Sequence, residues 1–559
     1  MRSQPRAPAA AAHVHLAARC RGGAHPRPGS RSSAGAAQGL ASSVLGAAAI
    51  AGVLAAAGPG RAQQVTLRTS DGSVTVTGPL ARFQDGTFAI RGVHGELSLP
   101  AANFTCVSPA CPGSTGFGIH GSNTIGAELM PRLIEAYARW HGVRISVANG
   151  APDETRFKLI GTDGRTAADI DLKAHGSGTA TPGLVSGEAL IGMASRPLNA
   201  AELAQLEDHG VPDMRRPGSE HVVALDGIIV IVSPANPVSQ LSLQQVQGIF
   251  AGAISDWSQV GGAPGRINVY ARDSRSGTFD TFKTLVLEPG KRDIAPDARR
   301  FESSPELSDL VAKDPRGIGF IGFAYGRNAK ALALTNDCGM VFFPDVFGVK
   351  TEEYPLSRRL FLYTPSLGSF APQSVAAGFI EYALSLKAQP VIRDAGFIDQ
   401  ALDQSNVQST RVASSRPPAA PDPAPAALMR DIAGTSRVST TLRFRANSTI
   451  LDNKALNDVD VLAQFLRFLR ESKSRRRLVL AGFSDTEGSA AKNIALSLDR
   501  AGVVRQALVR KDPHNADVID IRGYGPTLPV ACNDTEAGRD KNRRVEVWLT
   551  SGAAAPARQ

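Results

Sequence analysis

A proline-rich stretch at residues 405–436 constrains the fold most, because it divides the chain into parts that cannot share one core. Its centre, Arg416–Pro425, contains five prolines. Repeated proline favours an extended polyproline spacer, which separates domains instead of joining elements within one. The chain has 559 residues, which is too many for a single hydrophobic core. We therefore predict independent domains on either side of a linker at 405–436.

The positive charge of the chain is concentrated at its amino terminus. The formal net charge is +10, yet residues 1–62 contain seven arginines and no lysine, aspartate or glutamate. Removing those seven from the 61 basic residues leaves 54 against 51 acidic ones, a net charge of +3. A nearly neutral chain lacks the broad basic surface that nucleic-acid binding requires. We therefore expect no nucleic-acid partner.

Residues 1–62 have the pattern of a signal peptide and leader. An Arg-, Ala- and Pro-rich stretch precedes the apolar run Val44–Ala57, and small residues follow it up to Ala62. A positive region, a short apolar core and small residues before a cleavage site are typical of a secretory signal. We predict cleavage after Ala62. The alternative is an uncleaved membrane anchor, since about 20 weakly apolar residues can just span a bilayer.

The five cysteines bear on the redox compartment and on metal binding. Cys20 belongs to the leader, whereas Cys106 and Cys111 flank a short turn. Such a pair predicts a local disulfide in an oxidising compartment in preference to half of a metal site. Cys338 and Cys532 lie far apart in the sequence, so their state stays open, free thiols included. Because the ten histidines show no ligand spacing, we expect no metal and no cofactor.

Hydrophobic periodicity indicates three folded units after the leader. Residues 63–112 form short alternating runs broken by Asp-Gly and His-Gly pairs, which predicts a small β unit. In residues 113–404, short apolar strands such as 228–232 alternate with helical patterns, as in an α/β domain with a covered parallel sheet. Residues 437–552 repeat this alternation on a smaller scale. The predicted class is therefore multidomain α/β.

Three turns rich in Ser, Thr and Gly precede helical patterns in the middle domain, and they are candidate anion-binding sites. Free backbone N–H groups and the positive end of a helix dipole bind anions, and hydroxyl groups add neutral donors. A single turn of this kind is more simply explained as a helix cap. Three in one domain indicate a shared ligand. The candidate residues are Ser122, Asn123, Thr124, Ser177, Thr179, Ser276, Gly277 and Thr278.

Arg272 lies four residues before Ser276 and is the candidate charged group for the anion. A guanidinium can bind a tetrahedral oxyanion through two parallel hydrogen bonds. Its neighbour Asp273 has two possible roles: it orients Arg272, or it accepts a proton from a protonated phosphate. The second role would select phosphate over sulfate, which has no proton to donate at neutral pH. A plain surface ion pair is an equally good interpretation of Arg272 and Asp273.

The middle domain resembles the phosphate-binding protein of bacterial phosphate ABC transporters, a type II periplasmic binding protein. The resemblance spans most of 117–400, in the segments Gly121–Thr124, Gly176–Leu198, Asp226–Ile228, Ile249–Gly252, Asp256–Trp257, Arg272–Thr278 and Tyr354–Arg358. It implies two lobes joined by two crossing strands, closure on inorganic phosphate or a similar oxyanion, and an ABC permease as partner. Some members have an Asp where this chain has Ser195–Arg196, whereas others have Ser-Arg. Both residues join the candidate site, and the choice of anion stays open.

The C-terminal unit resembles the outer membrane protein A-like domain, which binds peptidoglycan, over nearly all of 440–549. The matching segments are Gly482–Ser489, Gly523–Gly525 and Asn542–Glu546. The resemblance implies that Asp485 and Arg500 clamp the ammonium and the carboxylate of the diaminopimelate stem. It also implies that Asn493 and Arg544 shape the pocket. The sequence departs at Phe483–Ser484, where many members have His or Tyr followed by Thr, although Ser keeps the hydroxyl.

These features predict a non-enzymatic, exported binding protein in a Gram-negative-type periplasm, attached to the wall and associated with the outer membrane. One alternative is a structural envelope scaffold whose binding-protein domain has no ligand. Another is a phosphate sensor without a transport role. An enzyme would need a nucleophile beside a base, or a metal site. The sequence contains neither a nucleophile-elbow motif nor metal-ligand spacing.

Overall fold

The computed structural model describes residues 64–551 except 70–73, 93–94, 107–115, 162–163, 165, 275, 366–374, 407–422 and 446–447. The predicted leader with its cleavage site lies outside the described residues. The predicted Cys106–Cys111 disulfide does so too, because Cys111 is not described. Within the described ranges, no helix is both long enough and apolar enough to span a membrane.

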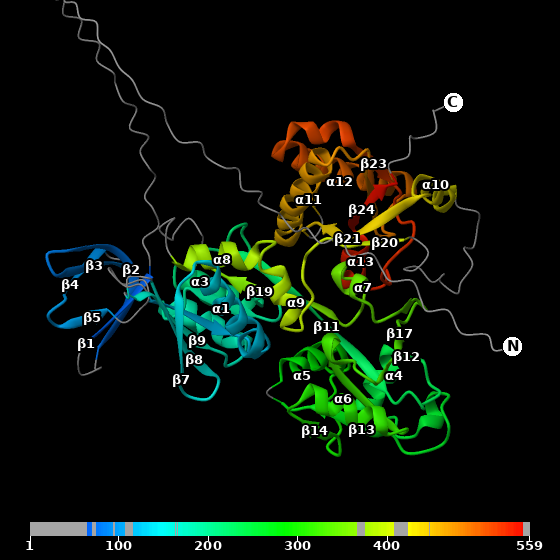
Figure 1. Cartoon of the computed structure of the whole chain (residues 1–559), viewed down its shortest axis with the longest axis horizontal. Coiled ribbons are helices and arrows are strands. Elements are labelled where there is room, and N and C mark those ends of the chain that lie inside the picture. Colours follow the sequence, from blue (N-terminus) through cyan, green and yellow to red (C-terminus); the bar gives the residue numbers. More distant parts are fainter. Residues whose placement is uncertain are drawn as a thin grey trace, which may run out of the picture. The chain divides into compact units, whose positions relative to one another are not determined.

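The small N-terminal unit is an antiparallel sheet with strand order β4-β3-β2-β1-β5, drawn in blue in Figure 1. Asp85 and Gly86 link β2 to β3 and both have positive φ, at 50° and 67°. Such a turn matches the twist of the strands that it joins. The prediction of a small β unit is therefore confirmed. The strands are β1 (Gln64–Thr69), β2 (Thr75–Gln84), β3 (Thr87–Gly92), β4 (Gly95–Pro100) and β5 (Phe104–Cys106).

The middle domain has two lobes built on one long sheet, with strand order β14-β13-β15-β11-β19-β10-β6-β9-β8-β7. We call residues 116–219 together with 360–403 lobe 1, and residues 228–356 lobe 2. The strands of lobe 1 are β6 (Gly116–Gly121), β7 (Arg144–Asn149), β8 (Glu154–Ile160), β9 (Thr166–Lys173) and β10 (Ile191–Ala194). Its helices are α1 (Met130–Trp140), α2 (Ala180–Ser186), α3 (Ala200–Asp208), α8 (Val375–Leu384) and α9 (Gln389–Asp394).

Two crossing strands form the hinge between the lobes, as the resemblance implied. The first half of β11 (Glu220–Val232) pairs antiparallel with β19 (Ser357–Tyr363), and its second half pairs with β15 (Gly317–Gly322) of lobe 2. The apolar stretch 228–232 in β11 is fully buried, as expected of a covered strand, but it runs antiparallel to its neighbours, so the expectation of parallel pairing is wrong for this strand. The remaining elements of lobe 2 are β12 (Gln240–Ser242), α4 (Leu243–Phe250), β13 (Asn268–Arg272), α5 (Gly277–Phe282), β14 (Arg299–Phe301), α6 (Ser304–Lys313), β16 (Lys330–Ala331), β17 (Ala333–Thr335), β18 (Val341–Phe342) and α7 (Val346–Lys350).

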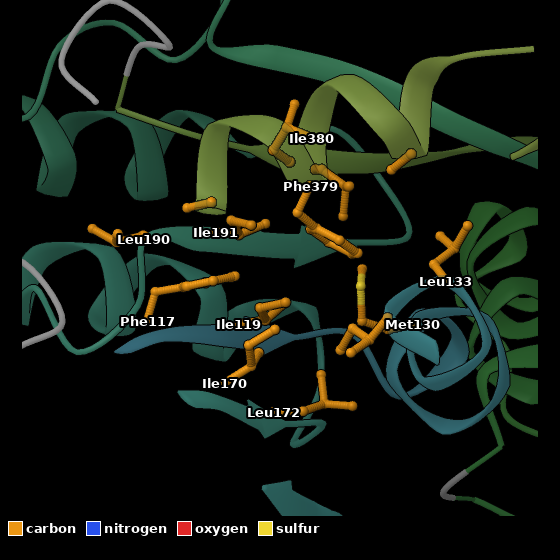
Figure 2. Close-up of a cluster of buried hydrophobic side chains, with 14 of the residues drawn as sticks. Phe117, Ile119, Met130, Leu133, Ile170, Leu172, Leu190, Ile191, Phe379 and Ile380 are labelled. Carbon is orange, nitrogen blue, oxygen red and sulfur yellow. The ribbon is translucent and has the colours of Figure 1, made fainter. Parts of the chain in front are cut away.

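The core of lobe 1 lies between its sheet and the helices α1 and α8 (Figure 2). Ile119 on β6 and Ile191 on β10 meet Phe379 and Ile380 from α8, and all four side chains are completely buried. Burying a side chain of this size stabilises the fold by about 1.5–3 kcal/mol. This packing holds the ends of β6, β9 and β10 in fixed positions, from which the candidate turns emerge.

The C-terminal domain is a mixed sheet with strand order β20-β21-β24-β22-β23, covered by two long helices. Only β22 and β23 run parallel in it. The side chain of Asp452 caps the first long helix by accepting a hydrogen bond from the Ala455 N–H at 2.7 Å. The elements are β20 (Gln404–Asn406), α10 (Pro423–Asp431), β21 (Thr435–Arg443), α11 (Asn453–Glu471), β22 (Leu478–Gly482), α12 (Ala490–Lys511), β23 (Ile519–Gly523), α13 (Glu536–Asn542) and β24 (Arg544–Thr550).

The predicted linker is shorter than expected at both ends. Residues 404–406 pair with β21, and 423–431 form α10, so only 407–422 remain between the described parts. Prolines are tolerated in the first turn of a helix, where their missing N–H group would have no partner. Leu428 and Ile432, four residues apart, are buried against Phe483 and Tyr524. This packing makes residues 423–436 part of the C-terminal domain.

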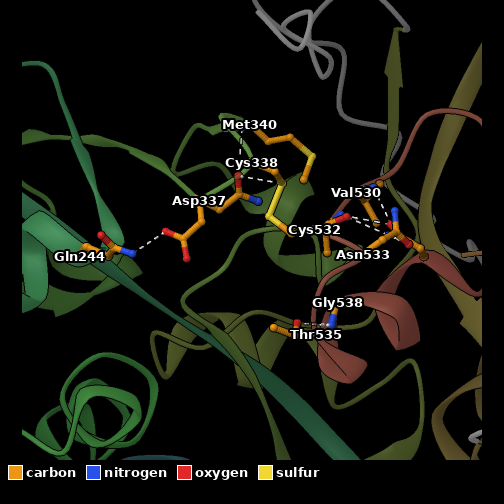
Figure 3. Close-up of a disulfide and its surroundings, with 12 residues drawn as sticks. Gln244, Asp337, Cys338, Met340, Val530, Cys532, Asn533, Thr535 and Gly538 are labelled. Carbon is orange, nitrogen blue, oxygen red and sulfur yellow. Dashed lines mark hydrogen bonds between the residues drawn. A yellow bond between two sulfur atoms is a disulfide. The ribbon is translucent and has the colours of Figure 1, made fainter. Parts of the chain in front are cut away.

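Cys338 and Cys532 form a disulfide, so they are not free thiols (Figure 3). Their Cα atoms are 5.8 Å apart although 194 positions separate them in the sequence. Cys338 lies between β17 and β18 of lobe 2, and Cys532 precedes α13 of the C-terminal domain. Pairing depends on spatial distance and not on sequence distance, which is why the sequence left it open.

Candidate functional site

The predicted turns of lobe 1 meet at one edge of the sheet. Residues 121–124 follow β6, residues 176–179 follow β9, and Ser195 follows β10. These three strands are parallel, so their carboxyl ends lie together, where open α/β sheets bind ligands. Gly121 has φ 141°, and an added Cβ would lie 2.0 Å from the Met193 carbonyl oxygen. Only glycine allows this close approach of β6 and β10.

Hydroxyl groups from these turns face one another in a buried place. The Oγ atoms of Ser177 and Ser195 are 3.1 Å apart, and the Ser195 N–H also donates to Ser177 Oγ at 3.1 Å. Ser122 is 1% exposed, and its Oγ has no hydrogen-bond partner within the described part of the chain. A buried hydroxyl without a partner is costly unless a ligand or water satisfies it.

The other residues of these turns make local contacts. Thr179 Oγ1 donates to the Gly176 carbonyl at 2.8 Å. Asn123 lies beside Gly176, since an added Cβ there would be 3.5 Å from Asn123 Oδ1. Thr278 lies at the start of α5, and its Oγ1 would be 4.0 Å from a Cβ added to Gly322.

Lobe 2 meets this edge at the start of α5. An added Cβ on Gly277 would lie 1.6 Å from Thr124 Oγ1, so the two lobes touch here and only glycine fits. Ser276 Oγ accepts hydrogen bonds from the N–H groups of Thr278 and Phe279, at 3.2 and 3.4 Å. Ser276 therefore acts as the helix cap that was the simpler explanation for any one turn.

Arg358 connects both lobes at the centre of this cluster. Its Nη2 donates to Gly277 O at 2.7 Å, to Thr124 Oγ1 at 3.0 Å and to Asp226 Oδ2 at 3.3 Å. Burial lowers the pKa of Arg358, while Asp226 and Asp280 act in the opposite direction. Burial likewise raises the pKa of Asp226 from its usual value, and Arg358 opposes that effect.

Asp280 adds a carboxylate to the same place. Ser195 Oγ donates to Asp280 Oδ2 at 3.4 Å, and Arg358 Nη1 is 3.7 Å from that oxygen. The side chain of Asp280 remains 59% exposed, so a ligand in the cleft could reach it. A cavity of about 290 Å³ is lined by Ser195, Arg196, Asp280 and Arg358 among others.

Arg272 makes its hydrogen bonds outside the Arg358 cluster. Its Nε donates to the Phe301 carbonyl at 3.2 Å, and its Nη1 donates to Ser304 Oγ at the start of α6. Asp273 Oδ2 is 4.0 Å from Arg272 Nη2, an ion-pair distance, so the possible roles of Asp273 stay predictions. Burial lowers the pKa of Arg272, and Asp273 opposes this effect.

The charge of Arg196 is neutralised locally. Its two terminal nitrogens each donate to a Glu202 oxygen at 2.8 Å, and this hydrogen-bonded pair raises the pKa of Arg196. Glu202 belongs to the capping box of α3, which keeps it in place. Arg196 therefore lines the cavity with its charge already paired.

A second cluster lies on the C-terminal domain, between the loop after β22 and the helix α12. Asn493 and Arg500 are seven residues apart and therefore share one face of α12. Arg500 is 2% exposed, and its Nε and Nη1 have no hydrogen-bond partner among the described residues. Burial lowers the pKa of Arg500, as does Arg543, while Asp485 raises it. The ring of Phe444 lies 5.5 Å from the guanidinium carbon.

Arg543, not Arg544, faces Asp485 in this cluster. Arg543 Nη1 donates to Asp485 Oδ2 at 2.9 Å. The predicted residue Arg544 is completely buried, pairs with Glu546 at 2.6 Å and lies over the ring of Phe483. Its role is structural in this geometry. Arg543 is the C-cap of α13, whereas Arg544 is the first residue of β24, and sequence order alone did not resolve this change of element.

Comparison with known proteins covers both domains. Residues 162–387 match the PBP superfamily domain, and residues 443–543 match the OmpA family. The phosphate-binding protein PstS of Pseudomonas aeruginosa is 29% identical over 245 residues, which cover 41% of this chain and 74% of the relative. PstS of Staphylococcus haemolyticus is 30% identical over 238 residues, which cover 41% of this chain and 72% of the relative. This chain belongs to the phosphate-binding protein family.

This member of the family carries an OmpA domain after its binding-protein domain, so the predicted fusion is confirmed. The crystal structure of an ABC-type phosphate transport receptor from Vibrio cholerae has 25% sequence identity to the chain. The match covers 50% of this chain and 99% of the receptor chain, with a TM-score of 0.38.

Four residues of this phosphate-binding protein family member were not predicted as site residues. Arg358 and Asp226 lie in segments that the resemblance covers, so the segments were noticed but no role was given to them. Arg543 lies beside the predicted Arg544. Asp280 lies in α5, four residues after Ser276. No sequence pattern indicated it, because it reaches the site only where the two lobes meet.

Proposed function

We propose that the chain captures inorganic phosphate or a similar tetrahedral oxyanion between its lobes, and that its C-terminal domain holds it on peptidoglycan. The observation that carries the first half is the buried cluster around Arg358. There, hydroxyl groups from three turns converge and that of Ser122 lacks a partner within the described chain. Membership in the phosphate-binding protein family supports this choice of ligand.

The cluster has the donors that an oxyanion needs. The hydroxyls of Ser122, Ser177 and Ser195 are neutral donors, and Arg358 supplies positive charge beside them. A dry, preorganised site strengthens such hydrogen bonds relative to water. Arg272 stays in the proposed site, but its guanidinium has to exchange Ser304 for the anion.

Asp280 gives the proposed site a means of choosing its anion. A carboxylate can accept a hydrogen bond from a protonated oxygen of phosphate, whereas fully ionised sulfate offers no proton and is repelled. We place this role on Asp280, because Ser195 stands where some relatives have an Asp and Asp280 Oδ2 is 3.4 Å from its hydroxyl.

The second half of the proposal rests on the contrast between Asp485 and Arg500. Diaminopimelate ends in an ammonium and a carboxylate. Asp485 can accept from the ammonium, and the partnerless nitrogens of the buried Arg500 can donate to the carboxylate. Charge-assisted hydrogen bonds of this kind are the strong ones. Arg543, which donates to Asp485, joins the proposed site.

Titration calorimetry of the exported chain with phosphate, sulfate and molybdate tests the first half. Heat with phosphate supports it, whereas no heat with any of the three anions contradicts it and favours a structural scaffold. Cosedimentation with isolated peptidoglycan tests the second half, with Asp485→Asn as the variant that should stay in solution. Wild-type cosedimentation of that variant would contradict the clamp.

The proposal also includes export and attachment to the wall near the outer membrane, with an ABC permease as recipient of the anion. The leader pattern of residues 1–62 and the family of the middle domain support it. A sensor without a transport role would bind phosphate equally well. Phosphate uptake by cells lacking this chain separates the two, since only the transport role predicts slower uptake.

A further inference from the structure

The C-terminal domain is fixed to lobe 2 by a covalent bond and by buried ion pairs. The disulfide Cys338–Cys532 joins the two parts (Figure 3). In addition, Arg437 Nη2 donates to Glu353 Oε1 at 2.5 Å, and Arg437 is completely buried. Arg443 donates from Nε to Glu352 Oε2 at 3.1 Å. Breaking a buried pair of this kind leaves an unpaired charge, so this contact is hard to separate.

The same domain also contacts lobe 1, at Asp403 next to the domain boundary and, through more exposed contacts, at the start of the hinge. Asn453 Nδ2 donates to the Arg215 carbonyl at 3.0 Å and to Glu220 Oε1 at 3.1 Å. Arg445 Nη2 donates to the same Arg215 carbonyl at 3.2 Å. Arg215 and Glu220 lie just before and at the start of the hinge strand β11. The C-terminal domain therefore contacts the chain on both sides of the hinge.

The second hinge strand, β19, links these contacts to the candidate site. Arg358 on β19 lies in the oxyanion cluster, and the next residue, Arg359, donates to Asp452 Oδ2 at 2.8 Å. Asp452 caps α11, whose first residue is Asn453. Arg359 also donates from Nη2 to Glu352 Oε2 at 2.8 Å. Neighbouring residues of one strand thus serve the cleft and the interdomain contact.

The lobes are closed in this arrangement. Thr124 of lobe 1 meets Gly277 of lobe 2, and Ser195 of lobe 1 donates to Asp280 of lobe 2. Opening the hinge would move lobe 1 relative to lobe 2. Because the C-terminal domain is bonded to lobe 2, the contacts of Asn453 and Arg445 with lobe 1 would have to break.

We propose that the C-terminal domain braces the two lobes in the closed arrangement and thereby slows release of the bound oxyanion. A contact made only in the closed state shifts the equilibrium toward that state and raises the affinity of any ligand that binds it. The identity of the ligand rests on the proposed function, whereas the brace itself does not.

The experiment uses the full chain, inorganic phosphate and three variants. Asn453→Ala with Arg445→Ala removes the side-chain contacts with Arg215 and Glu220, and Cys338→Ser with Cys532→Ser removes the covalent bond to lobe 2. Arg467→Ala, an exposed position on the same helix α11, is the matched control. Stopped-flow measurement should show phosphate released about fivefold faster from the first two variants, the lower end of typical coupling between sites, and at the wild-type rate from the control.

Hydrogen exchange of the phosphate-free protein keeps the brace testable without any ligand. Backbone amides at 120–125 and 276–281, which face each other across the cleft, should exchange faster in both brace variants than in the control. Unchanged exchange together with unchanged release would overturn the brace. Faster exchange in a protein that binds no phosphate would retain the brace and contradict only the proposed ligand.

Discussion

Arg358 illustrates how a single residue can organise a cleft formed by two lobes. It donates to Thr124 from lobe 1, to Gly277 from lobe 2 and to Asp226 on the hinge strand. Asp226 is 5% exposed and depends on this partner for its charge. Removing one member of such a buried pair strongly destabilises the fold, because the other charge stays buried without its partner.

We therefore expect Arg358→Ala to abolish phosphate binding and to lower the free energy of unfolding by about 3–5 kcal/mol, because Asp226 is left buried and unpaired. Calorimetry and urea unfolding measure the two effects. Arg292→Ala, an exposed arginine of lobe 2, should change neither. An Arg358→Ala protein that binds phosphate normally would remove Arg358 from the site.

Asp280→Asn tests the choice of anion. The neutral amide accepts a hydrogen bond from a protonated phosphate oxygen more weakly than a carboxylate does, and it no longer repels sulfate. The ratio of sulfate to phosphate Kd should fall at least tenfold, which is about 1.4 kcal/mol. Competition calorimetry gives the ratio, with the exposed Asp293→Asn as control. An unchanged ratio would mean that another group selects the anion.

Buried histidines should make the middle domain sensitive to acid. Burial lowers the pKa of His221 to about 4, and His120 is shifted in the same way to the same value. The unfolded chain binds protons near pH 6.5, whereas the folded chain resists them until about pH 4. Stability present above pH 6.5 is therefore lost as the pH falls toward 4.

In His221→Gln, the free energy of unfolding should fall by about 1–3 kcal/mol less between pH 7 and pH 4.5 than it does in the wild type, because one buried titrating group is gone. Urea unfolding across this range measures it. The exposed His209→Gln is the control, and its profile should match that of the wild type. A His221→Gln profile as steep as the wild type would contradict the assignment.

At the scale of elements, the loop after β22 and the helix α12 build the candidate peptidoglycan site, while β24 supports it. Arg500 on α12 is buried without a hydrogen-bond partner for its Nε and Nη1 in the described chain. Arg544 on β24 is also buried but is paired with Glu546. The two arginines therefore differ in whether their charge is kept for a ligand or used by the fold.

This difference predicts opposite outcomes for two alanine variants. Arg500→Ala should lose cosedimentation with peptidoglycan while keeping its thermal stability, because no ion pair is broken. Arg544→Ala should lower the free energy of unfolding by about 3–5 kcal/mol, since Glu546 is left buried and unpaired. Differential scanning calorimetry and cosedimentation distinguish the two. A stable Arg544→Ala protein without wall binding would return that residue to the site.

Elements were predicted well where a periodic pattern defined them. The buried face of α11 is indicated by Leu456, Val459, Phe465, Leu466 and Leu469, and three of these five are buried. The pattern was less reliable on α12, where Ile494 and Leu498 are 43% and 40% exposed. These two residues lie against Gly523 and Gly525, whose small size the periodicity of the helix does not include.

At the scale of the whole molecule, the disulfide Cys338–Cys532 closes a loop across two domains. A crosslink stabilises the folded state mainly by restricting the unfolded chain, and long loops gain the most. The brace proposed above depends on the same bond, so loss of the disulfide should affect both stability and release of the anion.

Cys338→Ser with Cys532→Ser should lower the free energy of unfolding by about 2–4 kcal/mol, because the unfolded chain regains freedom. Chemical unfolding followed by the fluorescence of Trp257 and Trp548, one in each domain, measures it. The single serine variants should match the double variant, since either one breaks the bond. Unfolding identical to the wild type would show that the bond does not form in solution.

The sequence by itself determined the division into domains, the strands and helices with clear periodicity, and the turns that carry Ser122, Ser177 and Ser276. These features depend on residues that are near one another in the chain. Only the tertiary structure decided which charges meet, namely Arg358 with Asp226, Arg543 with Asp485, and Cys338 with Cys532. The partners in these pairs are 132, 58 and 194 positions apart, and no local pattern encodes which distant group fills the remaining space.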